Sequence, residues 1–230
     1  MNIKKSLLPG LLIILCLLAV TTVRAEQGKP TYSDLTKLVR ETQMMEKEGD
    51  DLMLIWWMPE EFWTMSLAQT NSLDDSLKAT TVALFRPYTV IAVVAGKVGP
   101  LGGMTFVPED SIRATTRLVD AKDNSYSPIM PESLEANVST MLQVMAPIMG
   151  NMMGPIGKNM RFLVFPSMSK DSMPIASATQ PGSFKVVMGQ KEFKWRLPLS
   201  SLVQAKICPK CKEECSGAWR YCAWCGTELD

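Results

Sequence analysis

Two pairs of cysteines near the C-terminus constrain the fold of this 230-residue chain more than any other feature. They are Cys208-Pro-Lys-Cys211 and Cys222-Ala-Trp-Cys225, and each pair presents two sulfur atoms at positions i and i+3. Two turns of this kind can close a tetrahedron of four thiolates around Zn²⁺. About ten residues separate the pairs, which is enough for a hairpin but too few for an apolar core. The spacing therefore predicts that a metal ion holds this segment together, with Cys208, Cys211, Cys222 and Cys225 as ligands.

The residues next to these cysteines favour the same interpretation. Pro209 fixes the first turn, and Gly226, directly after Cys225, tolerates the positive φ that such a turn commonly needs. On these residues, segment 206–230 resembles the C-terminal zinc-ribbon module found on many bacterial proteins. The resemblance implies the metal site with the same four ligands. It implies no activity, because such modules serve as structural caps and as interaction surfaces alike.

The same cysteines admit two other interpretations. In an exported protein two pairs can form disulfides, and a single Cys-x-x-Cys can act as a redox pair, as in thioredoxin-like proteins. The doubled spacing, with Pro and Gly in turn positions, favours metal. Cys215 is left over, and it is either a bystander thiol on the hairpin or a resolving or redox-sensing residue.

The N-terminus has the pattern of an export signal. Lys4 and Lys5 precede an apolar run from Leu11 to Val20, and Val23-Arg24-Ala25 places small residues at the −3 and −1 positions of a signal-peptidase site. We therefore expect a signal peptide over residues 1–25, with cleavage after its last residue, and a periplasmic or secreted protein. Export conflicts with a thiolate zinc site, which forms most easily in a reducing compartment.

The charge balance argues against nucleic acid as a partner. The first 25 residues hold three of the 24 basic residues and none of the 23 acidic ones, so the remaining chain has a net charge of about −2. No basic block interrupts it, and the basic residues of segment 206–230 are matched by acidic ones. The partner we expect is a protein or another component of the cell envelope.

The first part of the mature chain is predicted to be mostly helical. A helix capped by Ser33 has apolar positions at three- and four-residue steps and is predicted to stop at Gly49. Residues 52–58 are too apolar for an exposed element. A second helix follows Pro59, where two glutamates suit a first turn, and a third is predicted over residues 73–85.

From residue 88 onward the pattern changes to strands. The run Thr89–Val98 predicts a central strand covered on both faces, and alternation from Ile112 to Leu118 predicts a half-buried strand. Further strands are predicted at 161–165, 184–188 and 193–197, with a turn at Asp123-Asn124. These elements indicate an α+β chain with an antiparallel β-sandwich-like body.

A methionine-rich insertion at residues 131–160 is predicted to form one or two helices broken by Pro and Gly. Its methionines admit three interpretations: an apolar face packed on the sandwich, Cu(I) binding by thioethers, and an adaptable docking surface. The docking surface is predicted at residues 141–160, where helix breakers leave part of the apolar surface around Met145, Met149, Met152 and Met153 exposed.

The absence of histidine weighs against an enzyme, because no imidazole base or Ser-His or Cys-His pair can form. No small-molecule substrate is indicated either. The sequence predicts an exported, non-enzymatic zinc-binding protein that is a structural or interaction module; the alternatives are a thiol-disulfide redox protein and a Met-rich copper-handling protein. Its predicted parts are a signal peptide (1–25), a helical segment (26–87), a β-sandwich-like domain (88–205) with the helical insertion (131–160), and a zinc ribbon (206–230).

Overall fold

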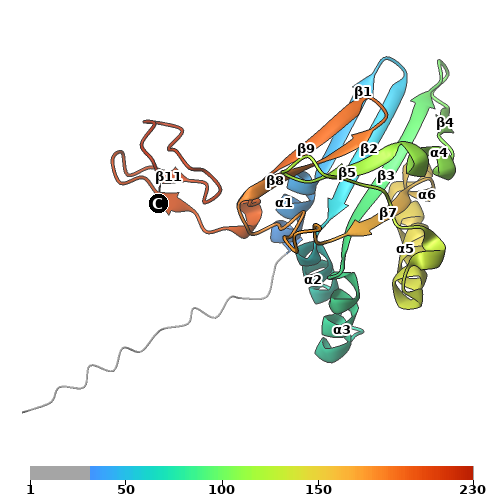
Figure 1. Ribbon diagram of the computed structural model, residues 1–230, viewed down its shortest axis with the longest axis horizontal. Coiled ribbons are helices and arrows are strands. Elements are labelled where there is room, and N and C mark those ends of the chain that lie inside the picture. The colour runs from blue at the N-terminus through green and yellow to red at the C-terminus, as the bar shows by residue number, and fades with distance from the viewer. Residues whose placement is uncertain (1–31, 230) are drawn as a thin grey trace, which may run out of the picture.

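The computed structural model describes residues 32–229, which form a layer of helices, a five-stranded sheet, a four-stranded sheet and, near the C-terminus, a two-stranded sheet (Figure 1). The helices are α1 (Tyr32–Thr42), α2 (Glu60–Ala68), α3 (Asp75–Phe85), α4 (Glu109–Thr115), α5 (Ala136–Met153) and α6 (Pro155–Lys158), with 3₁₀ turns η1 (Pro131–Ser133) and η2 (Ser200–Leu202). The strands are β1 (Gln43–Glu48), β2 (Asp51–Met58), β3 (Tyr88–Val98), β4 (Met104–Phe106), β5 (Thr116–Val119), β6 (Ser125–Tyr126), β7 (Arg161–Pro166), β8 (Gly182–Met188), β9 (Lys191–Leu197), β10 (Lys206–Ile207) and β11 (Glu214–Cys215).

All strand pairs of the two large sheets are antiparallel, which confirms the predicted α+β class. In the five-stranded sheet, β1 pairs with β2 and β2 with β3. The other side of β3 pairs with β7 along its first half and with β4 along its second. The four-stranded sheet has the order β6-β5-β8-β9. The run predicted to be a central strand is β3, which has pairing partners on both edges and is buried along most of its length.

One face of the five-stranded sheet packs on the four-stranded sheet through aromatic rings. Trp57 of β2 meets Phe184 of β8 edge to face, with ring centroids 4.8 Å apart. Trp195 of β9 stacks on Phe184 at 4.9 Å and lies 6.3 Å from Trp57. Such pairs contribute about 0.5–1.5 kcal/mol beyond the apolar area they bury. These three rings therefore join the two sheets.

The opposite face of the five-stranded sheet is covered by helices. Trp56 directly precedes Trp57 and therefore points to this opposite face. It meets Phe62 of α2 edge to face, with ring centroids 5.0 Å apart. Its indole N–H donates a hydrogen bond to the hydroxyl of Thr42 at the end of α1, 3.2 Å away. Because both faces of β2 are covered, its second half is buried without alternation, as expected for residues 52–58.

The methionine-rich insertion forms α5 and α6, which pack on the helical face beside β7. Phe162 of β7 and Trp56 of β2 both lie opposite Ala92 of β3, so their side chains point to the same, helical face of the sheet. Phe162 lines a small cavity together with Leu142 of α5. Met149 and Met160 are buried, so the prediction that Met149 belongs to an exposed docking surface is wrong. Its side chain belongs to the core instead. The exposed apolar side chains of α5 are Val144, Ile148 and Met152.

Two predicted elements are wrong because distant strands decide their structure. The helix predicted to stop at Gly49 ends at Thr42, and the next residues form β1, paired with β2. The strand predicted from Ile112 begins at Thr116, where pairing with β8 begins. The residues before it form α4, which buries Ile112.

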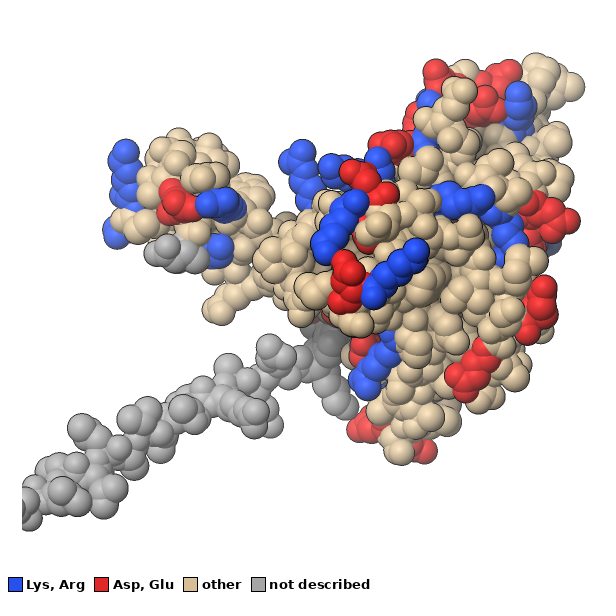
Figure 2. All heavy atoms as spheres, in the orientation of Figure 1, with Lys and Arg blue, Asp and Glu red and all other residues tan. Residues whose placement is uncertain are grey.

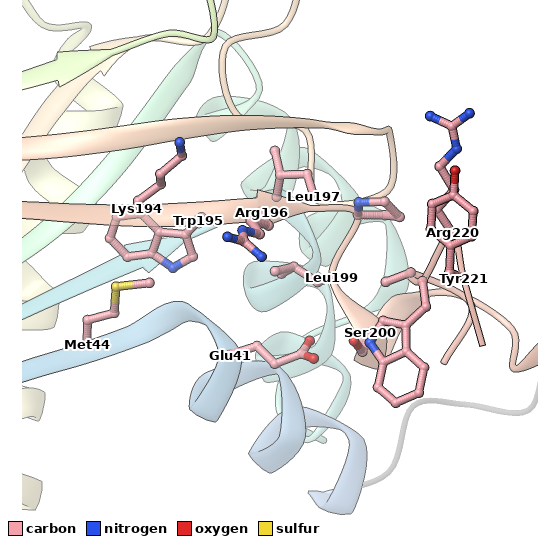
Figure 3. A pocket seen from close by; sticks show the side chains of 13 residues that line it. Glu41, Met44, Lys194, Trp195, Arg196, Leu197, Leu199, Ser200, Arg220 and Tyr221 are labelled. Carbon is pink, nitrogen blue, oxygen red and sulfur yellow. The ribbon is translucent and has the colours of Figure 1, made fainter. Parts of the chain in front are cut away.

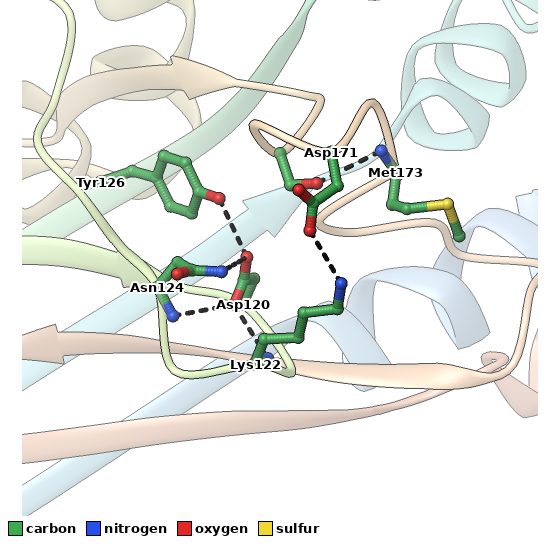
Figure 4. Close-up of polar contacts among 7 residues, drawn as sticks. Asp120, Lys122, Asn124, Tyr126, Asp171 and Met173 are labelled. Atoms are coloured by element: carbon green, nitrogen blue, oxygen red, sulfur yellow. Dashed lines mark hydrogen bonds and ion pairs between the residues drawn. The ribbon is translucent and has the colours of Figure 1, made fainter.

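Asp120, after β5, holds the turn to β6 with four hydrogen bonds (Figure 4). One carboxylate oxygen accepts from the backbone N–H groups of Lys122 and Asn124, each at 2.9 Å. The other accepts from the side-chain amide of Asn124 at 3.0 Å and from the hydroxyl of Tyr126 at 2.9 Å. Burial opposes the charged form, but these bonds outweigh it and hold the pKa of Asp120 below its usual value.

Replacing Asp120 with Ala is expected to lower the free energy of unfolding by about 2 kcal/mol or more at pH 7, because charged hydrogen bonds are lost. Since the folded-state pKa lies below the ordinary value of 3.8, this stabilisation is present above that pH and is lost as the pH falls through the folded pKa. Urea unfolding at pH 7 and at pH 3 measures both effects. Asp171→Ala is the control, since it removes only an exposed ion pair with Lys122 (Figure 4), and an equal loss in both variants would contradict this role of Asp120.

Candidate metal centre

The C-terminal segment has a small core of its own and stands apart from the sheets in Figure 1. Its two short strands pair with Lys206 opposite Cys215. Its buried residues form a cluster separate from the main core: Cys208, Cys215, Cys222 and Leu229. We call residues 206–229 the ribbon and residues 32–205 the body.

The first predicted cysteine pair lies in a tight turn closed by two backbone hydrogen bonds. The N–H of Lys212 donates to the carbonyl of Cys208 at 3.0 Å, and the N–H of Cys208 donates to the carbonyl of Glu213 at 2.9 Å. Lys212, directly after Cys211, has a φ of 64°. This left-handed conformation turns the chain back after the second cysteine, so that both sulfur atoms are presented on one side.

The second turn repeats the hydrogen bonds of the first. The N–H of Gly226 donates to the carbonyl of Cys222 at 2.9 Å, and the N–H of Cys222 donates to the carbonyl of Thr227 at 2.8 Å. The positive φ expected of Gly226 is confirmed at 72°. The two turns are therefore equivalent in backbone structure, although a lysine occupies in one the position that glycine occupies in the other.

The four predicted ligand sulfurs lie together. All of them are within 4.8 Å of one another. The sulfur of Cys208 is 3.5 Å from that of Cys225, and the sulfur of Cys211 is 3.6 Å from that of Cys222. A tetrahedral ion with bonds of about 2.3 Å to sulfur places its ligands about 3.8 Å apart. The arrangement can therefore hold one metal ion of this size without a change in the turns.

The surroundings of the cysteines favour thiolates unequally. The hydroxyl of Thr227, 3.3 Å from the Cys225 sulfur, and the backbone N–H of Thr227 lower the pKa of Cys225 to about 6. The N–H of Glu213 favours the thiolate of Cys211, but burial and the neighbouring thiols raise its pKa to about 12. Four sulfurs this close cannot all ionise without a cation between them, and a bound divalent metal ion meets that condition.

Cys215 lies beside the cluster rather than on the surface of the hairpin. It is buried, and its sulfur is 3.6 Å from that of Cys222. Burial is the largest of the effects that raise its pKa, so the protonated thiol is favoured and can donate to the neighbouring sulfur. It does not belong to the four sulfurs that lie mutually close.

Gly217 of the ribbon packs closely against the backbone of the segment that precedes the ribbon. A Cβ atom on Gly217 would lie 2.0 Å from the carbonyl oxygen of Gln204, a backbone atom that cannot move aside easily. Only glycine permits this approach without a shift of the backbone.

The structure thus brings together the four cysteines that the sequence analysis predicted as ligands. Sequence analysis missed Lys212, Thr227 and the position of Cys215. A hydroxyl residue two positions after the last cysteine was the available signal for Thr227. No such signal marks Lys212, because lysine does not specify a positive φ.

No protein-family model, curated protein or solved structure matches the chain. Among residues 32–229, no helix is both long and apolar enough to cross a membrane. The predicted signal peptide at 1–25 lies outside the described residues.

We expect Cys222→Ser to abolish metal binding and Cys215→Ser to preserve it, because only the first change removes one of the four mutually close sulfurs. The body should stay folded in both variants, since the ribbon has a separate core. Metal content by mass spectrometry and thermal unfolding by circular dichroism measure the two effects. Loss of metal in both variants would make Cys215 part of the site, and unfolding of the body would show that the ribbon supports it.

Proposed function

We propose that this chain is an exported Zn²⁺-binding protein that works as a structural or interaction module and not as an enzyme. The observation that carries the proposal is the cluster of four sulfurs, each within 4.8 Å of the others. Zinc is the ion of choice for four thiolates in a tetrahedron, and such closed sites stabilise a fold without leaving a position for a substrate.

The sulfur contacts favour a metal over redox pairs. The 3.5 and 3.6 Å contacts join a sulfur of the first turn to a sulfur of the second, Cys208 to Cys225 and Cys211 to Cys222. A thioredoxin-like pair would instead use the two sulfurs of one Cys-x-x-Cys. Contacts across the turns are the arrangement that a shared central ion needs.

The chemistry of the rest of the chain supports a non-enzymatic role. The sequence contains no histidine, so an imidazole base cannot act anywhere in it. Asp120, a buried carboxylate, already accepts four hydrogen bonds within its own turn. These hydrogen bonds explain the lowered pKa of Asp120 as a structural feature of the turn, without a catalytic role.

Export is supported by the sequence pattern of the first 25 residues. Two lysines precede the apolar run Leu11–Val20, and Val23-Arg24-Ala25 fits a signal-peptidase site. Zinc bound before or soon after translocation would protect the thiolates from oxidation, which reconciles the ribbon with an oxidising compartment.

Purified without chelator or reductant, the protein is expected to carry one zinc per chain. Metal analysis and thiol titration should be done on the same sample. After zinc release by a chelator under denaturing conditions, the five cysteines of the ribbon should titrate as free thiols. A sample without zinc in which four sulfurs are oxidised would contradict the proposal and favour disulfides.

Export is tested separately from metal binding. N-terminal sequencing of the protein from the cell envelope or medium should begin at Glu26. Ala25→Gln places a large residue at the cleavage site and should leave the longer chain in the membrane fraction. A full-length chain in the cytoplasm would refute export but would leave the zinc site unaffected.

A further inference from the structure

A cleft of about 480 Å³ lies where the ribbon meets the body (Figure 3). Its wall on the body comes from the end of β9, from η2, and from the junction of α1 and β1. Residues 218–221 of the ribbon form the other wall. In Figure 3, Met44 and Glu41 lie on one side of the opening, and Arg220 and Tyr221 lie across from them. The cleft therefore depends on how the ribbon stands against the body.

Two of the three basic residues that line the cleft lack an acidic partner among the described residues. Among the described residues, Lys194 and Arg196 of β9 make no ion pair, whereas Arg220 is paired with Glu228 at 3.1 Å. The acidic group of the cleft is Glu41, and it is occupied by hydrogen bonds from the backbone N–H and hydroxyl of Ser201. In Figure 2, basic side chains lie on the edge of the body that faces the ribbon, with acidic side chains among them. A ligand with negative charge would complement this wall.

The same wall is the open edge of a sheet. β9 is the last strand of the four-stranded sheet and pairs with β8 on one side only. At its start, Lys191 binds Glu46 and Glu48 of β1, which ties that end of the edge to the five-stranded sheet. At its other end, residues 194–197 line the cleft, and no strand among the described residues pairs with their free side. An extended peptide is the ligand that an open strand edge fits.

Aromatic side chains complete the cleft. Trp219 and Tyr221 of the ribbon line it and are 44% and 53% exposed. The ring nitrogen of Trp195, which also lines the cleft, is buried and has no acceptor among the described residues. Trp and Tyr are enriched where proteins bind other chains, because they combine apolar area with a hydrogen-bonding group. These residues favour a partner with apolar side chains as well as charge.

We propose that this cleft binds an extended acidic segment of a partner protein, which pairs with the free edge of β9. Side chains of an added strand alternate between faces, so acidic residues at i and i+2 lie beside Lys194 and Arg196. The peptide residue between these two acidic residues would point to the opposite face, toward Met44, and we expect it to be apolar. The inference rests on the proposed zinc-held ribbon, because that ribbon supplies Trp219 and Tyr221.

Binding is measured by fluorescence anisotropy with the full, zinc-loaded chain. The probes are labelled octapeptides in which Asp or Glu alternates with Val, Phe or Met, and the comparison peptides carry Lys in place of the acids. The acidic peptides are expected to bind. Combining Lys194→Glu with Arg196→Glu should weaken binding roughly tenfold or more, since two attractions become repulsions.

The matched control combines Lys158→Glu with Lys170→Glu, which changes the net charge equally at two exposed positions outside the cleft. This control should bind like the unaltered chain. Zinc content, measured in every variant, separates the two proposals: a chain that lacks zinc refutes the metal site, whereas a zinc-loaded chain that does not bind the acidic peptides refutes this inference alone.

Hydrogen exchange on the unaltered chain tests the strand pairing itself. Bound peptide should slow exchange of backbone amides within residues 194–197, because the free edge becomes hydrogen-bonded. Absence of protection there, equal binding of the Lys peptides, or equal affinity of the cleft and control variants overturns the proposal. Displacement of the acidic peptide by oligothymidylate of equal charge would also overturn it, by showing a general polyanion site.

Discussion

The burial of β2 on both faces is the constraint on which the body depends. Because successive side chains of a strand point to opposite faces, Trp56 and Trp57 must each be covered by a different layer. The helices cover one and the four-stranded sheet covers the other. The five-stranded sheet thus becomes the middle layer, and the edge strand that lines the cleft is held in place through Trp195, which packs against Trp57.

The predictable parts of the fold are those fixed by neighbours in sequence. The turn at Asp123-Asn124, the helix after Pro59 and the long apolar strand β3 follow from local patterns, and the structure confirms them. Residues 43–48 were beyond such reasoning, since they continue a helical period and form a strand only through pairing with β2. The alternation around Ile112 predicts a strand, but over so few residues it fits equally well the short helix α4 that precedes β5.

The candidate metal site divides in the same way. Spacing alone identified the four cysteines, because each turn is a local structure that needs no distant partner. Spacing did not place Cys215 next to Cys222, since that contact depends on how β11 packs against the second turn. The cleft was equally out of reach, because it forms only where the ribbon and the end of β9 come together.

The contact between Gly217 and the carbonyl of Gln204 has an evolutionary consequence. It uses backbone atoms and the absence of a side chain, so the side chains that face the cleft take no part in it. Those side chains are therefore free to diverge while the close approach of Gly217 to Gln204 is kept. Substitutions in the cleft can in this way change its chemistry while this backbone contact is kept.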